Sequence, residues 1–220
     1  MGLLLLLCAQ DASWWSGWKE GSTVTLRTTT VCGRTKLVKE EKFTVARADA
    51  RSVVVKVETT ENGTTTARED THHAGDPPKA GGTEKGRQEL TVDGKKFACT
   101  VLEERQRGYG GDSVTTRWVC PDAPTPAGVV KEESRGSVGN NELTSSFKLV
   151  KLNAPVKVKG RTCSCWVVET FSADAVGRVT AKMWYSRDVP GRVVRQERRI
   201  ESGGEPTTVT VEVVALEIGK

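Results

Sequence analysis

Histidine and aromatic residues are scarce in this chain, and the scarcity of aromatic residues argues against a nucleic-acid partner. The sequence has two histidines, and aromatic residues make up 5% of its 220 residues. Proteins that bind single-stranded nucleic acid stack the bases on aromatic side chains beside Lys and Arg. Here 33 basic and 28 acidic residues are mixed along the chain and give a net charge of +5. Without a basic stripe or stacking residues, we expect no nucleic-acid partner.

The motifs of common enzymes and metal sites are also missing. No G-x-S-x-G sequence supplies a nucleophile elbow, and the two histidines, His72 and His73, are neighbours. A structural zinc site usually needs four Cys or His ligands, and the C-x-C pair Cys163 and Cys165 has no second pair to complete one. We expect a non-catalytic protein without a metal or cofactor. A disulfide from Cys32 to Cys163 or Cys165 is possible, and the sequence does not decide between them.

Long apolar runs are absent except at the start of the chain. Residues 1–9, MGLLLLLCA, resemble the apolar core of a secretory signal peptide with cleavage after Ala9. No Lys or Arg precedes the leucines, which is consistent with a truncated start; the alternative is a short buried N-terminal segment. No other stretch approaches the ~20 apolar residues of a membrane helix. We expect an exported protein, periplasmic or extracellular.

The β-branched residues Val and Thr are abundant, and such residues favour pleated strands over helices. Part of the chain is also repeated. VDGKKFACTVLEE, residues 92–104, aligns with VKGRTCSCWVVET, residues 158–170, at an offset of 66. We divide the chain into a signal peptide, an N-terminal β unit, a Pro- and Gly-rich linker or loop and two repeat copies: residues 1–9, 10–70, 71–87, 88–153 and 154–220.

Turn signals predict four strands in each unit. They lie near 22–31, 35–47, 51–61 and 64–70 in the N-terminal unit, near 88–107, 112–120, 128–136 and 142–153 in the first copy, and near 155–172, 178–187, 191–201 and 206–217 in the second. Asn62-Gly63 is typical of a type I′ hairpin turn. We predict an all-β antiparallel meander of about a dozen strands in repeated four-stranded units, forming a curled sheet or a barrel-like shell. The alternative is a β-sandwich.

The glycine-rich turn at residues 108–111 fixes the pairing in the first copy. Paired residue numbers in an antiparallel hairpin have a constant sum, here 219. Val101 then lies opposite Trp118, and Cys99 lies opposite Cys120 at a non-hydrogen-bonded site, where Cα atoms approach to ~4.5 Å. That separation is within disulfide range, so we predict a Cys99–Cys120 disulfide.

The corresponding hairpin of the second copy is apolar on both faces. One face carries Cys163, Cys165, Val167 and Trp184, with Val167 opposite Trp184. The other face carries Trp166, Val168, Met183 and Tyr185. Such a face is covered either by neighbouring strands and the N-terminal tryptophans or by a ligand. We take Trp166, Val168, Met183 and Tyr185 as the candidate ligand-binding residues.

The segment 191–201 is rich in charge. Its arginines are Arg192, Arg195, Arg198 and Arg199, and they alternate with Glu197 and Glu201. This pattern is typical of a solvated strand face or edge.

Three sequence patterns carry a family resemblance. They are W-K-x-G-S-x-V at 18–24, G-[KR]-x-x-x-C-x-V at 94–101 and 160–167, and V-P-G-x-V-V at 189–194. The chain resembles a group of uncharacterised exported bacterial β-repeat proteins, whose motifs are structural. At the level of fold, a long exported meander also resembles the curled half-barrels of the LolA type, which carry lipoprotein acyl chains. LolA-like proteins cover the concave sheet with helices, whereas no amphipathic helix is predicted here.

Together these features favour a binding protein. We expect a non-catalytic exported protein that holds a lipid-like or other apolar small molecule in a β concavity. The alternative is a structural or protein-interaction module of the cell envelope, with a protein partner at its sheet edges and charged strands. The sequence leaves the ligand and the oligomeric state open.

Overall fold

The computed structural model describes residue 15 and residues 17–49, 51–73, 80–108, 111–139 and 141–219. Strands make up most of this part of the chain. They are β1 (Thr23–Cys32), β2 (Thr35–Ala48), β3 (Ser52–Glu61), β4 (Thr64–His73), β5 (Thr83–Val92), β6 (Lys95–Gly108), β7 (Gly111–Val119), β8 (Val129–Val138), β9 (Asn141–Val158), β10 (Arg161–Ala173), β11 (Arg178–Tyr185), β12 (Val193–Glu201) and β13 (Thr207–Glu217). A single turn of 3-10 helix, η3 (Pro126–Gly128), lies between β7 and β8.

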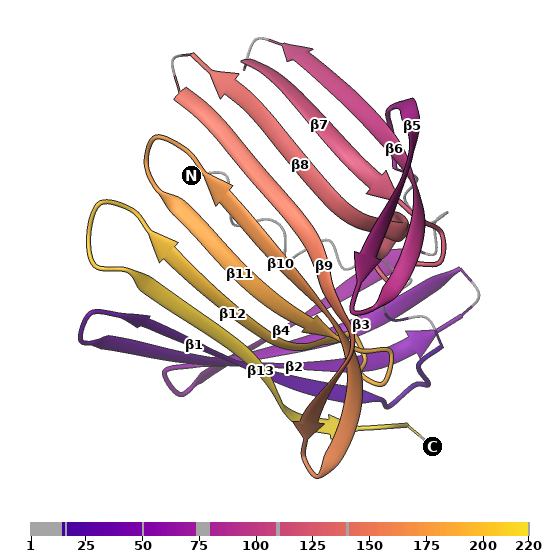
Figure 1. Ribbon diagram of the computed structural model, residues 1–220. Helices are drawn as coiled ribbons and strands as arrows, with labels where there is room; N and C mark the ends of the chain where they lie inside the picture. Colours follow the sequence, from indigo (N-terminus) through magenta and orange to yellow (C-terminus); the bar gives the residue numbers. More distant parts are fainter. Residues whose placement is uncertain are drawn as a thin grey trace.

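All 13 strands belong to one antiparallel sheet with the order β4-β3-β2-β1-β13-β12-β11-β10-β9-β8-β7-β6-β5 (Figure 1). The predicted all-β meander in a curled sheet is therefore confirmed. Each of the end strands β4 and β5 has one partner, β3 and β6 respectively, and no ladder joins β4 to β5 among the described residues. The sheet is consequently open rather than closed, and the alternative of two packed sheets is not formed.

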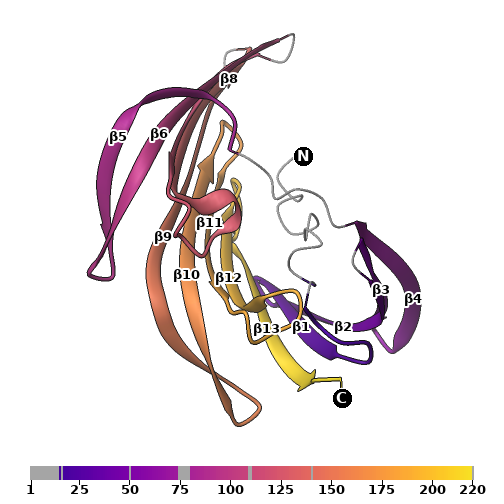
Figure 2. The ribbon, with the colours of Figure 1, turned by 90° about the vertical axis from the view of Figure 1, so that its right-hand side faces the viewer.

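The N-terminal unit lies beside the end of the chain rather than beside the first repeat copy. Strand β1 pairs with β13 from Thr23 opposite Glu217 to Cys32 opposite Thr207. The chain then runs outward to the β4 edge and resumes at the β5 edge. Ten peptide steps from His73 to Thr83 reach at most about 35 Å, so the end of β4 and the start of β5 must lie within that distance. The sheet accordingly curls, as Figure 2 shows along the series from β9 through β13 and β1 to β4.

Two hairpin turns were missed by the sequence prediction. Asp93 and Gly94 have φ values of 51° and 80°, and Lys159 and Gly160 have 45° and 82°. Positive φ at both central residues is the requirement of a type I′ turn. The predicted strand 88–107 is therefore the hairpin β5–β6, and the predicted strand 155–172 is divided between β9 and β10. The predicted turn at Asn62-Gly63 is confirmed, with φ values of 50° and 78°.

The segment between the N-terminal unit and the first copy is shorter than predicted. Strand β4 continues to His73 and β5 starts at Thr83, so both ends of the proposed linker 71–87 belong to strands. Residues 74–79 lie outside the described residues, as do residues 1–9, on which the signal-peptide prediction falls. Within the described ranges, no helix is long and apolar enough to span a membrane.

The predicted hairpin pairings are present, but the predicted disulfide is not. Val101 lies opposite Trp118 and Val167 lies opposite Trp184. Cys99 and Cys120 are both buried free thiols. The reason is that β7 ends at Val119, one residue before the expected pair. The Cys120 N–H donates instead to the Gly128 carbonyl, with an N to O distance of 2.8 Å, so Cys120 leaves the ladder.

Candidate ligand-binding hollow

One face of the sheet can be followed from strand to strand by its pairing. Residues directly opposite each other in an antiparallel ladder lie on the same face. One such row runs from β10 to β1 through Val168, Met183, Gln196, Val211 and Thr28. We call the face that carries this row, with the positions two residues away on each strand, the inner face.

The inner face is filled over β1–β3. On β1 it continues to Val24, which lies opposite Phe43 of β2, and Phe43 lies opposite Val57 of β3. Val24 and Val57 are each 1% exposed. Trp15, also 1% exposed, covers this region, because its ring centroid lies 5.8 Å from that of Phe43 and 6.1 Å from that of His72. The protein's own large side chains thus fill the space on this part of the face.

The same face is hollow at one end of β8–β12, whereas Leu149 and Val168 fill it at the other end. At the hollow end its rows consist mainly of small side chains: Ser145, Ser172 and Val179 in one row, and Phe147, Thr170 and Ala181 in the next. Two cavities of about 420 Å³ and about 1030 Å³ lie along these rows. They share Ser145, Ser172 and Val179 in their linings, so they form one continuous groove. Small side chains on a curled sheet leave this space unfilled.

Two polar groups of β12 point into the smaller cavity without a partner. Gln196 is 1% exposed, and its Oε1 atom accepts no hydrogen bond. Arg198 lines the same cavity, is half-buried, and forms no hydrogen bond or ion pair with any described residue. Burial lowers the pKa of Arg198 from its ordinary value, because a charge is less stable away from water. Buried polar groups are normally hydrogen-bonded, so the unpaired Gln196 Oε1 atom and Arg198 guanidinium are unusual.

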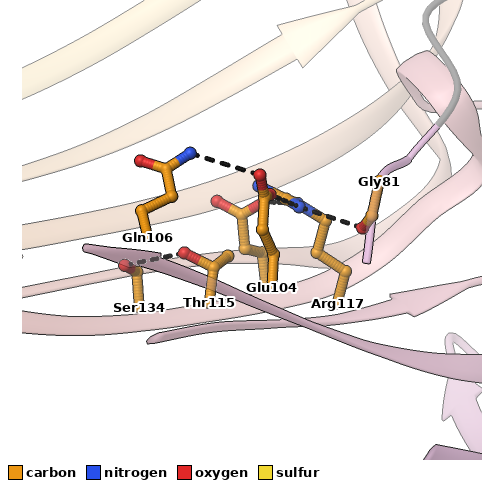
Figure 3. A network of polar contacts seen from close by, with 7 residues as sticks. Gly81, Glu104, Gln106, Thr115, Arg117 and Ser134 are labelled. Carbon is orange, nitrogen blue, oxygen red and sulfur yellow. Dashed lines mark hydrogen bonds and ion pairs between the residues drawn. The ribbon is translucent and has the colours of Figure 1, made fainter. Parts of the chain in front are cut away.

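A network of polar contacts borders the groove on β6–β8 (Figure 3). Arg117 of β7 donates to Glu104 through Nη1 and to Glu132 through Nε, both at 2.6 Å, and to the Gly81 carbonyl at 3.3 Å. Glu132 also lines the smaller cavity. The bond from Arg117 lowers the pKa of Glu104. This charged border is therefore satisfied within the chain, unlike Arg198.

The four predicted ligand residues lie together, but most of them are packed against one another. Trp166 stacks on Tyr185 with ring centroids 5.8 Å apart, and Val168 lies opposite Met183. Trp166 is 5% exposed and Val168 1% exposed. Burial raises the pKa of Tyr185 to about 12. Met183 is the one of the four that lines the cavity, so the other three are mainly part of its support.

The sequence prediction overlooked the polar residues of the groove. Gln196 and Arg198 alternate with the exposed residues Arg195 and Arg199 along β12. Arg195 and Arg199 pair with Glu197 and Glu201, as a solvated face should. The same alternation places Arg198 on the opposite face. Period-two spacing was therefore the available signal, because Gln196, Arg198 and Ile200 share one face of a strand.

The C-x-C pair lies in the core. Cys163 and Cys165 are 2% and 0% exposed, and both belong to a hydrophobic cluster with Val158, Val189 and Val194. Burial, with smaller contributions from Cys163 and Asp188, raises the pKa of Cys165 to about 12. Its thiol is therefore neutral at physiological pH and a poor nucleophile. No group of three His, Cys, Asp or Glu residues in the described ranges is arranged to hold a metal ion.

Comparisons with known proteins give distant likenesses in fold only. No family model matches the chain, and no curated protein sequence does. A solved structure from Bacteroides fragilis, described as "a putative exported protein with YmcC-like fold", is 12% identical, with 90% of this chain and 96% of that chain covered and a TM-score of 0.46. The MucA/MucB complex from Pseudomonas aeruginosa gives 10% identity, coverage of 96% and 97%, and a TM-score of 0.19.

Proposed function

We propose that this is an exported, non-catalytic binding protein that holds an apolar or amphiphilic small molecule in the groove over β8–β12. The observation that carries the proposal is the continuous space on the inner face, beside a region that the chain fills with its own side chains. Ligand pockets typically measure about 300–1000 Å³. The two cavities, about 420 Å³ and about 1030 Å³, are of that size.

The rim of the groove supports an apolar ligand. Leu143 and Val176 line the larger cavity and are 38% and 75% exposed. Apolar side chains gathered around a concave surface are characteristic of binding sites, because their contact with water is unfavourable. Export is supported by the leucine-rich residues 1–9.

A neutral fluorescent dye tests the proposal. The wild-type protein is first extracted with organic solvent to remove any bound molecule. N-phenyl-1-naphthylamine should then gain fluorescence when it binds the refolded protein. Ala181 lies on the floor of the smaller cavity, so Ala181→Trp should fill the space and reduce dye affinity about tenfold or more. Thr180 is the exposed neighbour on the opposite face, and Thr180→Trp should bind the dye like the wild type. Mass spectrometry of the organic extract identifies any co-purified molecule.

The proposal is wrong if the folded wild type gives no gain in fluorescence and its extract contains no bound molecule. Equal affinity of the Ala181→Trp and Thr180→Trp variants would move the dye site elsewhere. Cooperative urea unfolding of both variants shows that they are folded, so that loss of binding is not loss of structure.

A second candidate, a protein-interaction module of the cell envelope, is favoured by the open edges of the sheet. Within the described part of the chain, strand β4 pairs only with β3, and most of its residues are exposed. Unpaired strand edges can add a strand from a partner. A partner captured from an envelope extract should be lost when Lys replaces Thr66 of β4 and retained in the Ala181→Trp variant. Equal capture by the two variants would argue against this function.

A further inference from the structure

We propose that Arg198 anchors the anionic headgroup of a single-chain amphiphile whose apolar tail lies along the groove. This inference rests on the proposed binding function and adds the chemical class of the ligand. It follows from the contrast between Arg198, which has no partner among the described residues, and the pairing of most charges around it.

The charges that border the groove are mostly neutralised within the chain. Glu132 accepts from Arg117 at 2.6 Å. At the far end, Arg178 pairs with Glu201. Arg198 has no such partner among the described residues, although it is half-buried beside Ala181 and Val209. An unpaired guanidinium in a partly apolar site is unfavourable, and a bound carboxylate or phosphate would relieve this by accepting two parallel hydrogen bonds.

Gln196 supplies an independent reason to place a polar headgroup at this position. It lies two residues before Arg198 on the same face of β12, and its side chain is almost fully buried with Oε1 unpartnered. An amide carries both an acceptor and two donors, and rotation about its last bond exchanges them. Gln196 can therefore donate to a headgroup oxygen beside Arg198 or accept from a hydroxyl there. An entirely apolar ligand would leave this amide unpaired.

The rest of the groove fits the tail. From Arg198 the smaller cavity runs over Ala181 and Phe147. It joins the larger cavity at Val179. The larger cavity continues to Leu143 and Val176. An apolar chain along this path would cover exposed apolar rim residues while its head remained at Arg198. The direction of the bound molecule is thus set by Arg198, because Arg178 and Glu201 at the far end pair with each other.

The experiment compares two ligands that differ in their headgroup alone. Dodecanoate and dodecan-1-ol are titrated, below their aggregation limits, against the dye-loaded protein, and dissociation constants are obtained from dye displacement. The wild type should bind dodecanoate about tenfold to a hundredfold more tightly than dodecan-1-ol. Arg198→Leu should abolish this preference and leave the affinity for dodecan-1-ol unchanged. Arg198→Lys, which keeps the charge without the planar fork, should fall between them.

Arg199→Leu is the matched control, because Arg199 is the adjacent exposed arginine on the opposite face, and it should behave like the wild type. Equal wild-type affinity for the two ligands, or equal loss of preference in Arg198→Leu and Arg199→Leu, would overturn the anchor while leaving the binding function intact. Absence of binding by the dye and both ligands would overturn the binding function itself. A preference for dodecanoate that is lost in Arg198→Leu and kept in Arg199→Leu supports both the anchor and the binding function.

Discussion

Two regions of the inner face differ in how they are packed. Over β1–β3 this face carries valines and Phe43, and Trp15 covers them. Over β8–β12 the rows at one end of the strands carry Ser145, Ser172 and Ala181, and a groove remains. The two regions thus differ in the volume of the side chains that they carry on this face. A curled sheet thus encloses a core or a binding space according to which residues occupy every second position.

The largest effect is expected from emptying the filled region. Trp15→Ala should lower the free energy of unfolding by about 3–5 kcal/mol, because a fully buried indole is replaced by a cavity. Urea unfolding followed by circular dichroism measures the change. Val176→Ala, at a residue 75% exposed on the rim of the groove, should change stability by less than about 0.5 kcal/mol. Similar losses in the two variants would remove the contrast between the two regions.

Larger side chains should destabilise the filled region and leave the stability of the hollow region nearly unchanged. Val55 is 0% exposed, so Val55→Leu should overpack its surroundings and cost about 1–3 kcal/mol. Ser172 lines both cavities, so Ser172→Leu has room and should be neutral or slightly stabilising. The midpoints of thermal unfolding compare them directly. A loss in Ser172→Leu as large as that in Val55→Leu would mean that the groove does not accept an added side chain.

Arg117 and Arg198 extend the comparison to charge. Arg117→Leu leaves Glu104 and Glu132 without their partner and should cost about 1–2 kcal/mol at pH 7. The folded-state pKa of Glu104 is depressed below its ordinary 4.5, so its contribution is present above that pH and is lost as pH falls through the folded value. The stability difference between wild type and Arg117→Leu should therefore shrink below about pH 4.5. A difference independent of pH would contradict the role of the ion pairs.

The smallest effect is expected at Arg198. Arg198 is half-buried and has no partner among the residues that the structure describes. Its removal in Arg198→Leu should therefore raise the free energy of unfolding by up to about 1 kcal/mol at pH 7 in ligand-free protein. Urea unfolding at several salt concentrations measures it, with Arg199→Leu as the exposed comparison. A clear loss of stability in Arg198→Leu would indicate that Arg198 is held by contacts in the folded chain.

Local patterns made most of the fold predictable, and departures from local pairing caused the errors. The glycine turn at 108–111 was sufficient to pair Val101 with Trp118. The Cys99–Cys120 disulfide failed because Gly128 draws Cys120 out of the ladder, a contact made by the following loop. The pairing of β1 with β13 could not be read from turns, since it joins residues at opposite ends of the sequence.

The candidate site was predicted less well than the fold, for a related reason. Alternation placed Met183 and Val168 on one face, as the structure has them. It could not show which part of that face the chain would cover, because coverage depends on the curl of the whole sheet. Arg198 was assigned to a solvated face from its charge, although its position in β12 placed it with Gln196.

The seam between β1 and β13 has a consequence for synthesis. Strand β1 pairs with β2 on one side and with β13 on the other. The Gly219 N–H also donates to the Ser22 hydroxyl at 3.1 Å, across 197 positions of sequence. Contacts so distant in sequence form slowly because a very long loop must close first. Until β13 emerges from the ribosome, the β1–β4 ribbon therefore has a second unpaired edge. The complete sheet can be assembled only once β13 has been synthesised.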